Sequence, residues 1–383
     1  MILQEVYLNI KDHYQIKLLA GEGGMETSID WVHSIEDKEV ASFLHGDELV
    51  LTTGIANAGE AWILAFVTEL YHKHACGILI NVGPYIKEIP ESVITFCKRN
   101  NFPLFLVPWE VRLVDITKEI SSMIFDQERE RITLVNSMKD AIFYPEEESS
   151  YCNPLKRHGY LIEKAFCPVL MEIQGWRLDE DGRNHTLELL KYMVTFRFSK
   201  AVFFSLSKYY VVILYQGDKE EIKECIDLIR KFDNSNQAFR ISSLIVGPNS
   251  EDIRKLHQSY QIACRMSNLA RKKKERVLDF RQLGTYQLLL NVQNLDLIKE
   301  YFCNVLGELK KEDEENGTEL FDLFRTYLET DCSVQQTAGI YYCHRNTINH
   351  RIYRIREILG ITEIDIFKKA EFMMAYEVYD IIR

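Results

Sequence analysis

The first part of the chain alternates short apolar runs with segments of helical periodicity. Apolar runs bounded by glycine or proline predict buried strands at Leu49–Thr53, Gly77–Val82 and Pro103–Val107. Between these runs, Trp62–His72 and Glu91–Arg99 carry apolar residues at the spacing of amphipathic helices. Because strands that alternate with helices favour a parallel sheet, we expect an α/β domain over residues 1–125.

A long helical pattern follows the last of these strands. It runs from about Val111 towards Ile142, and its apolar stripe weakens in the charged stretch Gln127–Arg131. It ends at Tyr144–Ser150, where a proline and acidic, polar residues are typical of a linker. We therefore expect a helical and acidic linker over residues 126–154. A signalling or dimerising helix is the alternative, and a plain connector is the simpler interpretation.

The middle of the chain predicts an α+β domain with a mixed sheet, over residues 155–290. The expected strands are Pro168–Ile173, Ala201–Leu206, Tyr209–Tyr215 and Ser242–Val246. The expected helices are Thr186–Phe198, Lys219–Phe232 and Ser250–Ala270. Ser207 and Lys208 stand between two of the strands and predict a two-residue hairpin, although neither is a favoured turn former.

The remaining residues predict helices only. We expect a charged linker helix over residues 291–317 and an all-α domain over residues 318–383. In that domain a first helix ends near Thr330, Ser333 caps a short second helix with Gln336 reaching back, and a third helix covers Arg345–Leu359. Two short helices, a tight turn and a longer basic helix are the outline of a helix-turn-helix.

The third helix has one apolar stripe and one polar face. At ~100° per residue, its isoleucines and Leu359 fall on a single buried side. Arg345, Arg351 and Arg356 lie nearer that stripe, from which long side chains can swing out to flanking phosphates. Asn, His and Arg side chains hydrogen-bond base edges, and arginine also pairs with phosphate. The residues expected to contact DNA are Arg345, Asn346, Thr347, Asn349, His350, Arg351 and Arg354.

The distribution of charge supports this interpretation. With 46 basic and 57 acidic residues the chain has a net charge of −11, which argues against non-specific coating of nucleic acid. From His344 to Arg356, however, there are four arginines and no acid. An ordinary surface helix usually interleaves glutamate with arginine, so we favour DNA binding over a solvated basic face. A second basic cluster, Arg271–Lys274 with Arg276, is interpreted as a solvated helix end rather than a phosphate-binding patch.

Several segments resemble one family of bacterial transcription regulators. His344–Ile352 (HRNTINHRI) is similar to the HRNT-x-x-x-R-hydrophobic signature of the PucR family, which is named for control of purine catabolism. Trp31–His33, Phe43–Gly54 and Phe102–Glu110 resemble its N-terminal sensory domain. Val246–Pro248, with the helix that follows, resembles the end of its central GGDEF-like domain. The resemblance covers nearly the whole chain, in the family's order.

The resemblance implies a regulator of a catabolic operon, for purines or related nitrogen compounds. It implies an N-terminal domain that responds to a small-molecule metabolite effector, and a Fis-like helix-turn-helix that binds operator DNA as a homodimer or higher homo-oligomer. The central domain would be a degenerate GGDEF-like domain, because no G-G-[DE]-[DE]-F occurs and the hairpin carries Ser207–Tyr210. Without paired carboxylates for Mg²⁺ we expect no enzyme and no cofactor. The alternative is a sensor or enzyme whose central domain still binds a nucleotide.

A small-molecule site in the first domain is not located by any motif. Its candidates are polar or aromatic residues near predicted strand ends, where open α/β sheets usually bind ligands. For any single residue, turn chemistry or a satisfied core histidine is the simpler interpretation. The effector-binding candidates are Trp31, His33, Glu36, Asp47, Glu48, Thr52 and Thr53.

The remaining composition excludes several classes of protein. With 46% hydrophobic and 27% charged residues, the chain is neither disordered nor fibrous. No uncharged apolar run reaches the ~18 residues that span a bilayer. The nine cysteines are scattered without a C-x-x-C pair, which is typical of reduced thiols, and the ten histidines show no metal-ligand spacing. We expect a cytoplasmic protein without a metal site or a membrane association.

Overall fold

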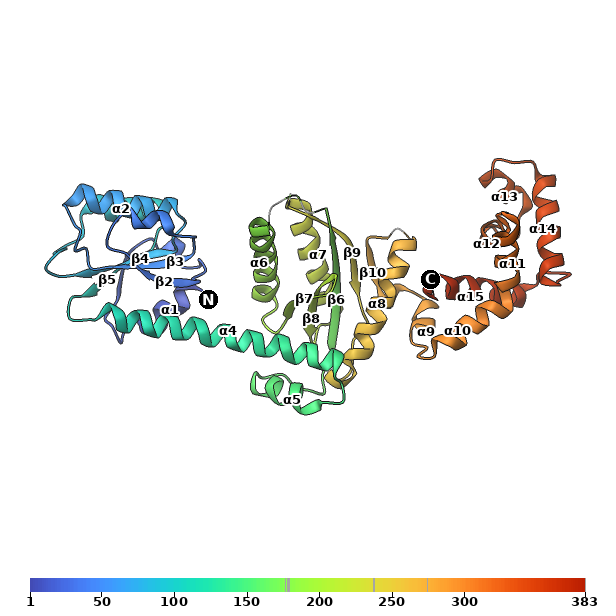
Figure 1. Ribbon diagram of the computed structural model, residues 1–383, viewed down its shortest axis with the longest axis horizontal. Coiled ribbons are helices and arrows are strands. Elements are labelled where there is room, and N and C mark those ends of the chain that lie inside the picture. The colour runs from blue at the N-terminus through green and yellow to red at the C-terminus, as the bar shows by residue number, and fades with distance from the viewer. Residues whose placement is uncertain (176, 178–179, 237, 274, 383) are drawn as a thin grey trace. The chain divides into compact units, whose positions relative to one another are not determined.

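The computed structural model describes residues 1–175, 177, 180–236, 238–273 and 275–382 (Figure 1). The chain divides into two compact units, residues 1–133 and residues 134–383. The division lies inside one long helix, α4 (Leu113–Phe143), and within the segment 126–154 that we expected to be a linker. The helix itself was predicted to within two residues at each end.

The N-terminal unit contains a five-stranded sheet whose strand order is β1-β5-β4-β3-β2. The last four of these strands are parallel, whereas β1 is antiparallel to β5, so the sheet is mixed and the expectation of a parallel sheet is wrong at this edge. Parallel neighbours need a crossover connection, usually a helix. β1 precedes the strands that alternate with helices, so it is free to pair antiparallel. The strands are β1 (Lys17–Ala20), β2 (Trp31–Ser34), β3 (Glu48–Thr52), β4 (Gly77–Val82) and β5 (Leu104–Pro108).

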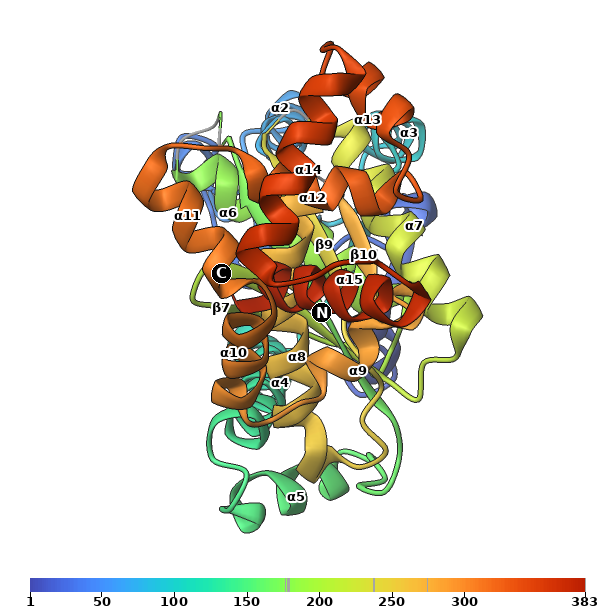
Figure 2. The same ribbon diagram turned by 90° about the vertical axis from the view of Figure 1, so that its right-hand side faces the viewer.

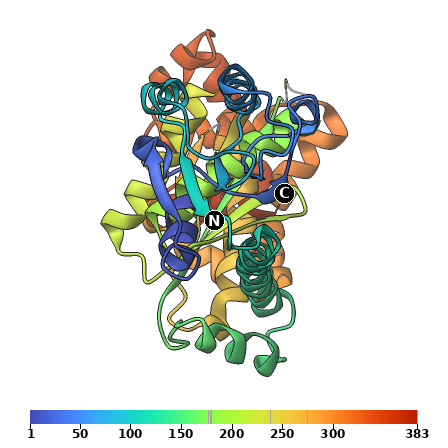
Figure 3. The ribbon, with the colours of Figure 1, turned by 90° about the vertical axis from the view of Figure 1, so that its left-hand side faces the viewer.

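Both faces of this sheet are buried under helices, as Figure 1 and Figure 3 show. Successive strand residues point to opposite faces. Val50 of β3 therefore packs with α2 (Glu60–His72) and α3 (Glu91–Asn100), while its neighbour Leu49 packs with α1 (Leu3–Ile10) and α4. A strand that is buried on both faces needs apolar residues at every position, which explains its continuous apolar run.

The central sheet has the strand order β10-β9-β6-β8-β7. All its neighbouring pairs are antiparallel except β10 with β9, which confirms the expected mixed sheet. The predicted hairpin joins β7 to β8, and Ser207 takes a positive φ of 54° in its turn. The likeness of this domain to GGDEF-like folds stays a prediction. The strands are β6 (Phe166–Gln174), β7 (Val202–Leu206), β8 (Tyr209–Tyr215), β9 (Arg240–Val246) and β10 (Val277–Asp279).

Helices pack on each face of the central sheet. On one face α6 (Glu180–Arg197) and α7 (Lys219–Ser235) cover the apolar side chains, and α5 (Glu148–Arg157) and α8 (Leu256–Lys273) cover the other. The start of α8 at Leu256 is later than predicted. The residues before Leu256 are not part of the helix. The backbone of Ser250 pairs with the start of β6, and Asp252 caps a separate 3-10 turn.

The C-terminal part of the second unit is helical (Figure 2). Its core is continuous with the core under α8, and α15 packs against both α8 and α10. A π-helical turn at Cys303–Gly307 joins α10 to α11. The helices are α9 (Tyr286–Leu290), α10 (Leu295–Phe302), α11 (Glu308–Asn316), α12 (Leu320–Glu329), α13 (Val334–Ile340), α14 (Arg345–Leu359) and α15 (Ile366–Ile382).

A buried carboxylate on α15 joins these helices to the central domain. Asp380 is 5% exposed and accepts hydrogen bonds from both terminal nitrogens of Arg325 on α12, at 3.0 and 2.9 Å. It also accepts the hydroxyl of Tyr286 at 2.9 Å, and Lys272 Nζ of α8 lies 3.8 Å away. Burial alone would lower the pKa of Arg325, but its hydrogen bonds to Asp380 and Glu329 raise it overall.

Described residues of the second basic cluster, Arg271–Lys274 with Arg276, make contacts within the second unit. Lys272 turns towards α15 and donates to the Tyr379 carbonyl at 2.8 Å, and Lys273 Nζ lies 4.4 Å from the centre of the Tyr286 ring. Both lysines are exposed, as expected of a solvated helix end, although each also contacts a neighbouring helix. Arg276 pairs with the buried Asp233. Lys274 lies outside the described residues.

We expect Asp380→Asn to destabilise the second unit by about 3 kcal/mol, because the substitution removes the buried carboxylate that binds Arg325 and Tyr286 and leaves the half-buried guanidinium with only the exposed Glu329 as counter-charge. Chemical denaturation followed by circular dichroism measures the change. The matched control is Asp296→Asn, whose side chain is 93% exposed in a surface pair with Lys299 and should leave the midpoint unchanged. Equal midpoints for the two variants would contradict a structural role for Asp380.

Candidate nucleic-acid interface

The second helix of the helix-turn-helix begins where the sequence predicts. The hydroxyl of Ser333 accepts the Gln336 backbone N–H at 3.3 Å and caps α13. The reciprocal half of the predicted capping box is wrong, because the Ser333 N–H already donates to the Thr330 carbonyl at 3.0 Å. The Thr330 and Thr337 hydroxyls, 2.9 Å apart, further tie α13 to the end of α12.

A tight turn then leads into the third helix. Tyr342 adopts a positive φ of 51°, and the Cys343 N–H donates to the Ala338 carbonyl at 3.1 Å. His344 is the N-cap of α14, where its Nδ1 accepts the Asn346 N–H at 3.3 Å. The Tyr342 side chain is 96% exposed at the tip of this turn. The sequence predicts a turn here but does not indicate the positive φ of Tyr342, which is unusual for a tyrosine.

The third helix buries its isoleucines and exposes its polar face. Ile348 and Ile355 are fully buried and Ile352 nearly so, all in the core that α12 and α15 share. Gly360, in the left-handed conformation, ends the helix. All seven side chains of the expected DNA-contact set are exposed, namely Arg345, Asn346, Thr347, Asn349, His350, Arg351 and Arg354.

A hollow of about 450 Å³ lies between the two helices. Arg345, Asn346 and Asn349 of α14 line it from one side, and Val334 and Gln335 of α13 line it from the other. Gln335 was missed by sequence analysis. Its signal was present, since it is the second residue of a capped helix that precedes the turn, but only the packing of α13 on α14 makes it line the same hollow as Asn346.

Acidic side chains do reach the basic helix, although the sequence between His344 and Arg356 contains none. Glu312 of α11 accepts a hydrogen bond from Arg354 Nη2 at 3.0 Å, and Glu357 lies 3.5 Å from Arg354 Nη1. The hydrogen bond from Arg354 to Glu312 raises the pKa of the guanidinium. Arg354 is thus exposed and also paired.

Arg356 does not swing outwards. Its Nε is buried and has no hydrogen-bond partner, and its guanidinium lies beside Tyr327 of α12 and Cys332. The expectation that it reaches a flanking phosphate is therefore wrong. Its place four residues after Ile352 turns it towards the core, where its apolar stem packs.

In the N-terminal unit, three of the candidate effector residues bind one another. Glu36 accepts hydrogen bonds from the Thr52 hydroxyl at 3.0 Å, from the Thr53 hydroxyl and N–H at 2.9 Å each, and from the N–H groups of Gly54 at 3.0 Å and Ile55 at 3.2 Å. The Glu36 side chain therefore accepts hydrogen bonds from the N–H and hydroxyl donors that follow the last residues of β3. In this geometry Glu36 orders the loop that follows the strand.

The other effector candidates lie away from this cluster, because Trp31 and Glu48 are the first residues of the parallel strands β2 and β3 and stand opposite each other at their amino ends. Glu48 is 7% exposed and accepts the N–H groups of His45 and Gly46, at 2.9 and 2.8 Å. Asp47 takes a positive φ of 62° in the turn before β3. The Trp31 ring is exposed and meets Phe125 of α4 edge to face at 5.5 Å, and His33 of β2 is half-buried.

In the described ranges, no group of three or more His, Cys, Asp or Glu side chains could hold a metal ion. No helix within those ranges is long and apolar enough to cross a membrane.

Comparison with known protein families matches both ends of the chain. Residues 8–124 match the Purine catabolism regulatory protein-like family, a range that includes all five strands of the first sheet. Residues 320–378 match the PucR C-terminal helix-turn-helix domain, a range that includes α12, α13 and α14.

Two curated proteins of Bacillus subtilis (strain 168) are similar to parts of the chain. The Purine catabolism regulatory protein is 24% identical over 193 residues, which are 49% of this chain and 35% of that protein. The Proline-responsive transcriptional activator PutR is 34% identical over 88 residues, which are 23% of this chain and 21% of that protein. The chain thus spans 35% and 21% of the lengths of these relatives.

One solved structure is also similar. It is the crystal structure of Regulator of Polyketide Synthase Expression from Bifidobacterium adolescentis, at 15% identity, with 66% of this chain and 92% of that chain covered. Its TM-score of 0.33 is too low to establish a shared fold.

We expect Glu36→Gln to destabilise the N-terminal unit by about 1–3 kcal/mol, since an amide nitrogen would replace an acceptor that faces N–H donors. Thermal unfolding and amide exchange of residues 52–55 measure the effect. Glu39→Gln, an exposed carboxylate close by in the chain, is the matched control. Unchanged protection of residues 52–55 in Glu36→Gln would show that Glu36 does not hold this loop.

Proposed function

The chain belongs to the PucR family of transcription regulators, and we propose that it binds a specific operator and regulates a catabolic operon. The observation that carries this proposal is the outer face of α14, where asparagine, histidine and arginine side chains are exposed opposite a buried isoleucine stripe. The family is one of regulators rather than enzymes.

In the proposed complex, the N-terminal half of α14 enters a major groove. Asn346, Asn349 and His350 lie on its outer face, where amide and imidazole groups can bond base edges. Arg345 and Arg351 reach the flanking phosphates, which supply most of the affinity and its dependence on salt. The exposed Tyr342 and Gln335 are placed to contact the backbone beside them.

We propose that the regulator acts as a homodimer in the cytoplasm. One recognition helix reads only a few base pairs, whereas two helices ~34 Å apart read successive major-groove turns on one side of the duplex. Sedimentation of the 383-residue chain with and without operator DNA measures the state directly. A strictly monomeric species under both conditions would contradict the dimer.

We propose further that the N-terminal unit responds to a small-molecule effector, and that the operon serves purine or related nitrogen catabolism. The names of the relatives support this class, since one is called a purine catabolism regulator and the other a proline-responsive activator. The candidate residues for the effector remain Trp31, His33, Glu36, Asp47, Glu48, Thr52 and Thr53.

We expect Asn349→Ala and His350→Ala to lower discrimination between operator and random duplex, because each removes a group that faces base edges. A lost bidentate base contact costs about 1–3 kcal/mol. Fluorescence anisotropy at fixed salt measures both affinities. Asn184→Ala and His185→Ala, an exposed pair of the same residue types on α6, are the matched controls. Wild-type discrimination in both α14 variants would show that these residues do not read bases.

We expect Arg351→Ala to weaken operator and random DNA alike and to reduce the salt slope by about 1, since it removes one phosphate contact. The slope of log K against log salt is measured between low and physiological salt. The control is Arg129→Ala, an exposed arginine on α4. A slope equal to that of the control would rule out a phosphate contact for Arg351.

A further inference from the structure

The acidic helix α11 is firmly attached to the DNA-binding domain. Asp313 accepts the N–H groups of Leu320 at 2.8 Å and Phe321 at 2.9 Å, and so caps the start of α12. Leu309, one turn earlier, is fully buried in the core. Because both ends of this helical turn are fixed, the residue before Asp313 has a fixed position against α14.

That residue is Glu312, which binds Arg354. The Glu312 side chain is 21% exposed and that of Arg354 is 54% exposed, so the guanidinium is more accessible to a DNA phosphate than the carboxylate is. Their hydrogen bond of 3.0 Å is a contact across 42 residues of sequence. Glu357 adds a second, longer contact at 3.5 Å from the same helix as Arg354.

We propose that Glu312 is an intramolecular competitor of DNA for Arg354, and that it limits the affinity of the protein for any duplex. This inference rests on the proposed DNA-binding function. In the free protein, Glu312 occupies the guanidinium. On binding, a DNA phosphate replaces the Glu312 carboxylate as the partner of Arg354, so that one ion pair is broken for each new one formed.

The position of Arg354 favours a phosphate rather than a base as the new partner. Arg354 lies nine residues after Arg345, roughly 13 Å along the helix axis. The N-terminal residues of a recognition helix reach base edges, and the part beyond them diverges towards the sugar–phosphate backbone. A phosphate contact carries no sequence information, so the competition weakens operator and random DNA by the same factor.

The size of the effect follows from the exposure of the pair. Partly exposed ion pairs contribute little, so we expect about a two- to fivefold gain in affinity when Glu312 is neutralised. General repulsion is a second contribution, because a carboxylate beside the interface also repels DNA at a distance. Only a double-mutant cycle separates these two effects.

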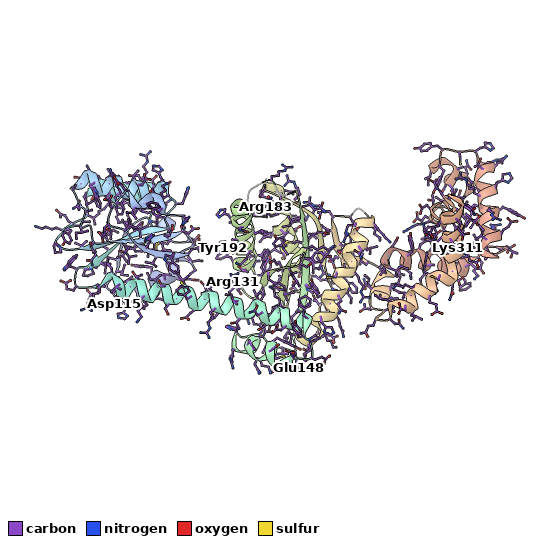
Figure 4. The ribbon with its side chains drawn as sticks, in the orientation of Figure 1. Asp115, Arg131, Glu148, Arg183, Tyr192 and Lys311 are labelled. Carbon is purple, nitrogen blue, oxygen red and sulfur yellow. The ribbon has the colours of Figure 1, made fainter. Side chains whose placement is uncertain are left out.

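The experiment compares four forms of the 383-residue chain: wild type, Glu312→Gln, Arg354→Ala, and the two substitutions combined. Anisotropy at fixed salt gives their affinities for operator and random duplex. The matched control is Glu315→Gln, on the same helix, whose carboxylate is 60% exposed and lies 3.5 Å from Lys311 Nζ. Lys311 is labelled on this helix in Figure 4. The control substitution removes the same charge without touching Arg354.

We expect Glu312→Gln to bind both duplexes about two- to fivefold more tightly, with no gain in the Arg354→Ala background and none for Glu315→Gln. The same gain in the Arg354→Ala background, or for Glu315→Gln, would overturn the competition in favour of general repulsion. Wild-type affinity for Glu312→Gln would overturn it outright. Absence of DNA binding by the wild type would instead contradict the proposed function itself.

Discussion

Burial of three isoleucines on one side of α14 is the constraint on which the DNA-binding site depends. Ile348, Ile352 and Ile355 each bury a large apolar side chain in the core, where α14 packs with α11, α12 and α13, and each contributes roughly 2 kcal/mol relative to exposure. Together they fix the rotation of the helix about its own axis. The polar residues between them, among them Asn349 and His350, therefore face outwards. The exposed arginines extend the same surface.

This part of the structure could be predicted from the sequence because its causes are local. Helical periodicity and the cap at Ser333 both lie within a few residues of the elements they define. The contacts that modify the charge of α14 are not local. The carboxylate of Glu312 comes from a different helix, 42 residues earlier in the chain, and no pattern within His344–Arg356 indicates it. A run of residues without acids in the sequence can therefore still be in contact with an acidic side chain in the folded protein.

The same distinction accounts for the rest of the fold. Strands buried on both faces, such as β3 and β4, show continuous apolar runs and were predicted, whereas the short edge strands β1, β2 and β10 have too few residues to form a pattern. Near the carboxyl end of β3, strand topology placed Glu36, Thr52 and Thr53 together, but only the structure shows that Glu36 itself occupies the donors of the loop. Asp380, which joins α8 to α12 and α15, likewise depends on contacts between distant segments.

The central claim is that the outer face of α14 selects particular DNA sequences. Sheared genomic DNA from the source organism is passed over the immobilised 383-residue chain, and the retained fragments are sequenced, in parallel with a variant that carries Asn346→Ala, Asn349→Ala and His350→Ala. The account predicts a few strongly enriched fragments for the wild type that share a short two-fold motif, and loss of that enrichment in the variant. Enrichment of the same fragments by the variant, or none by a folded wild type, would contradict it.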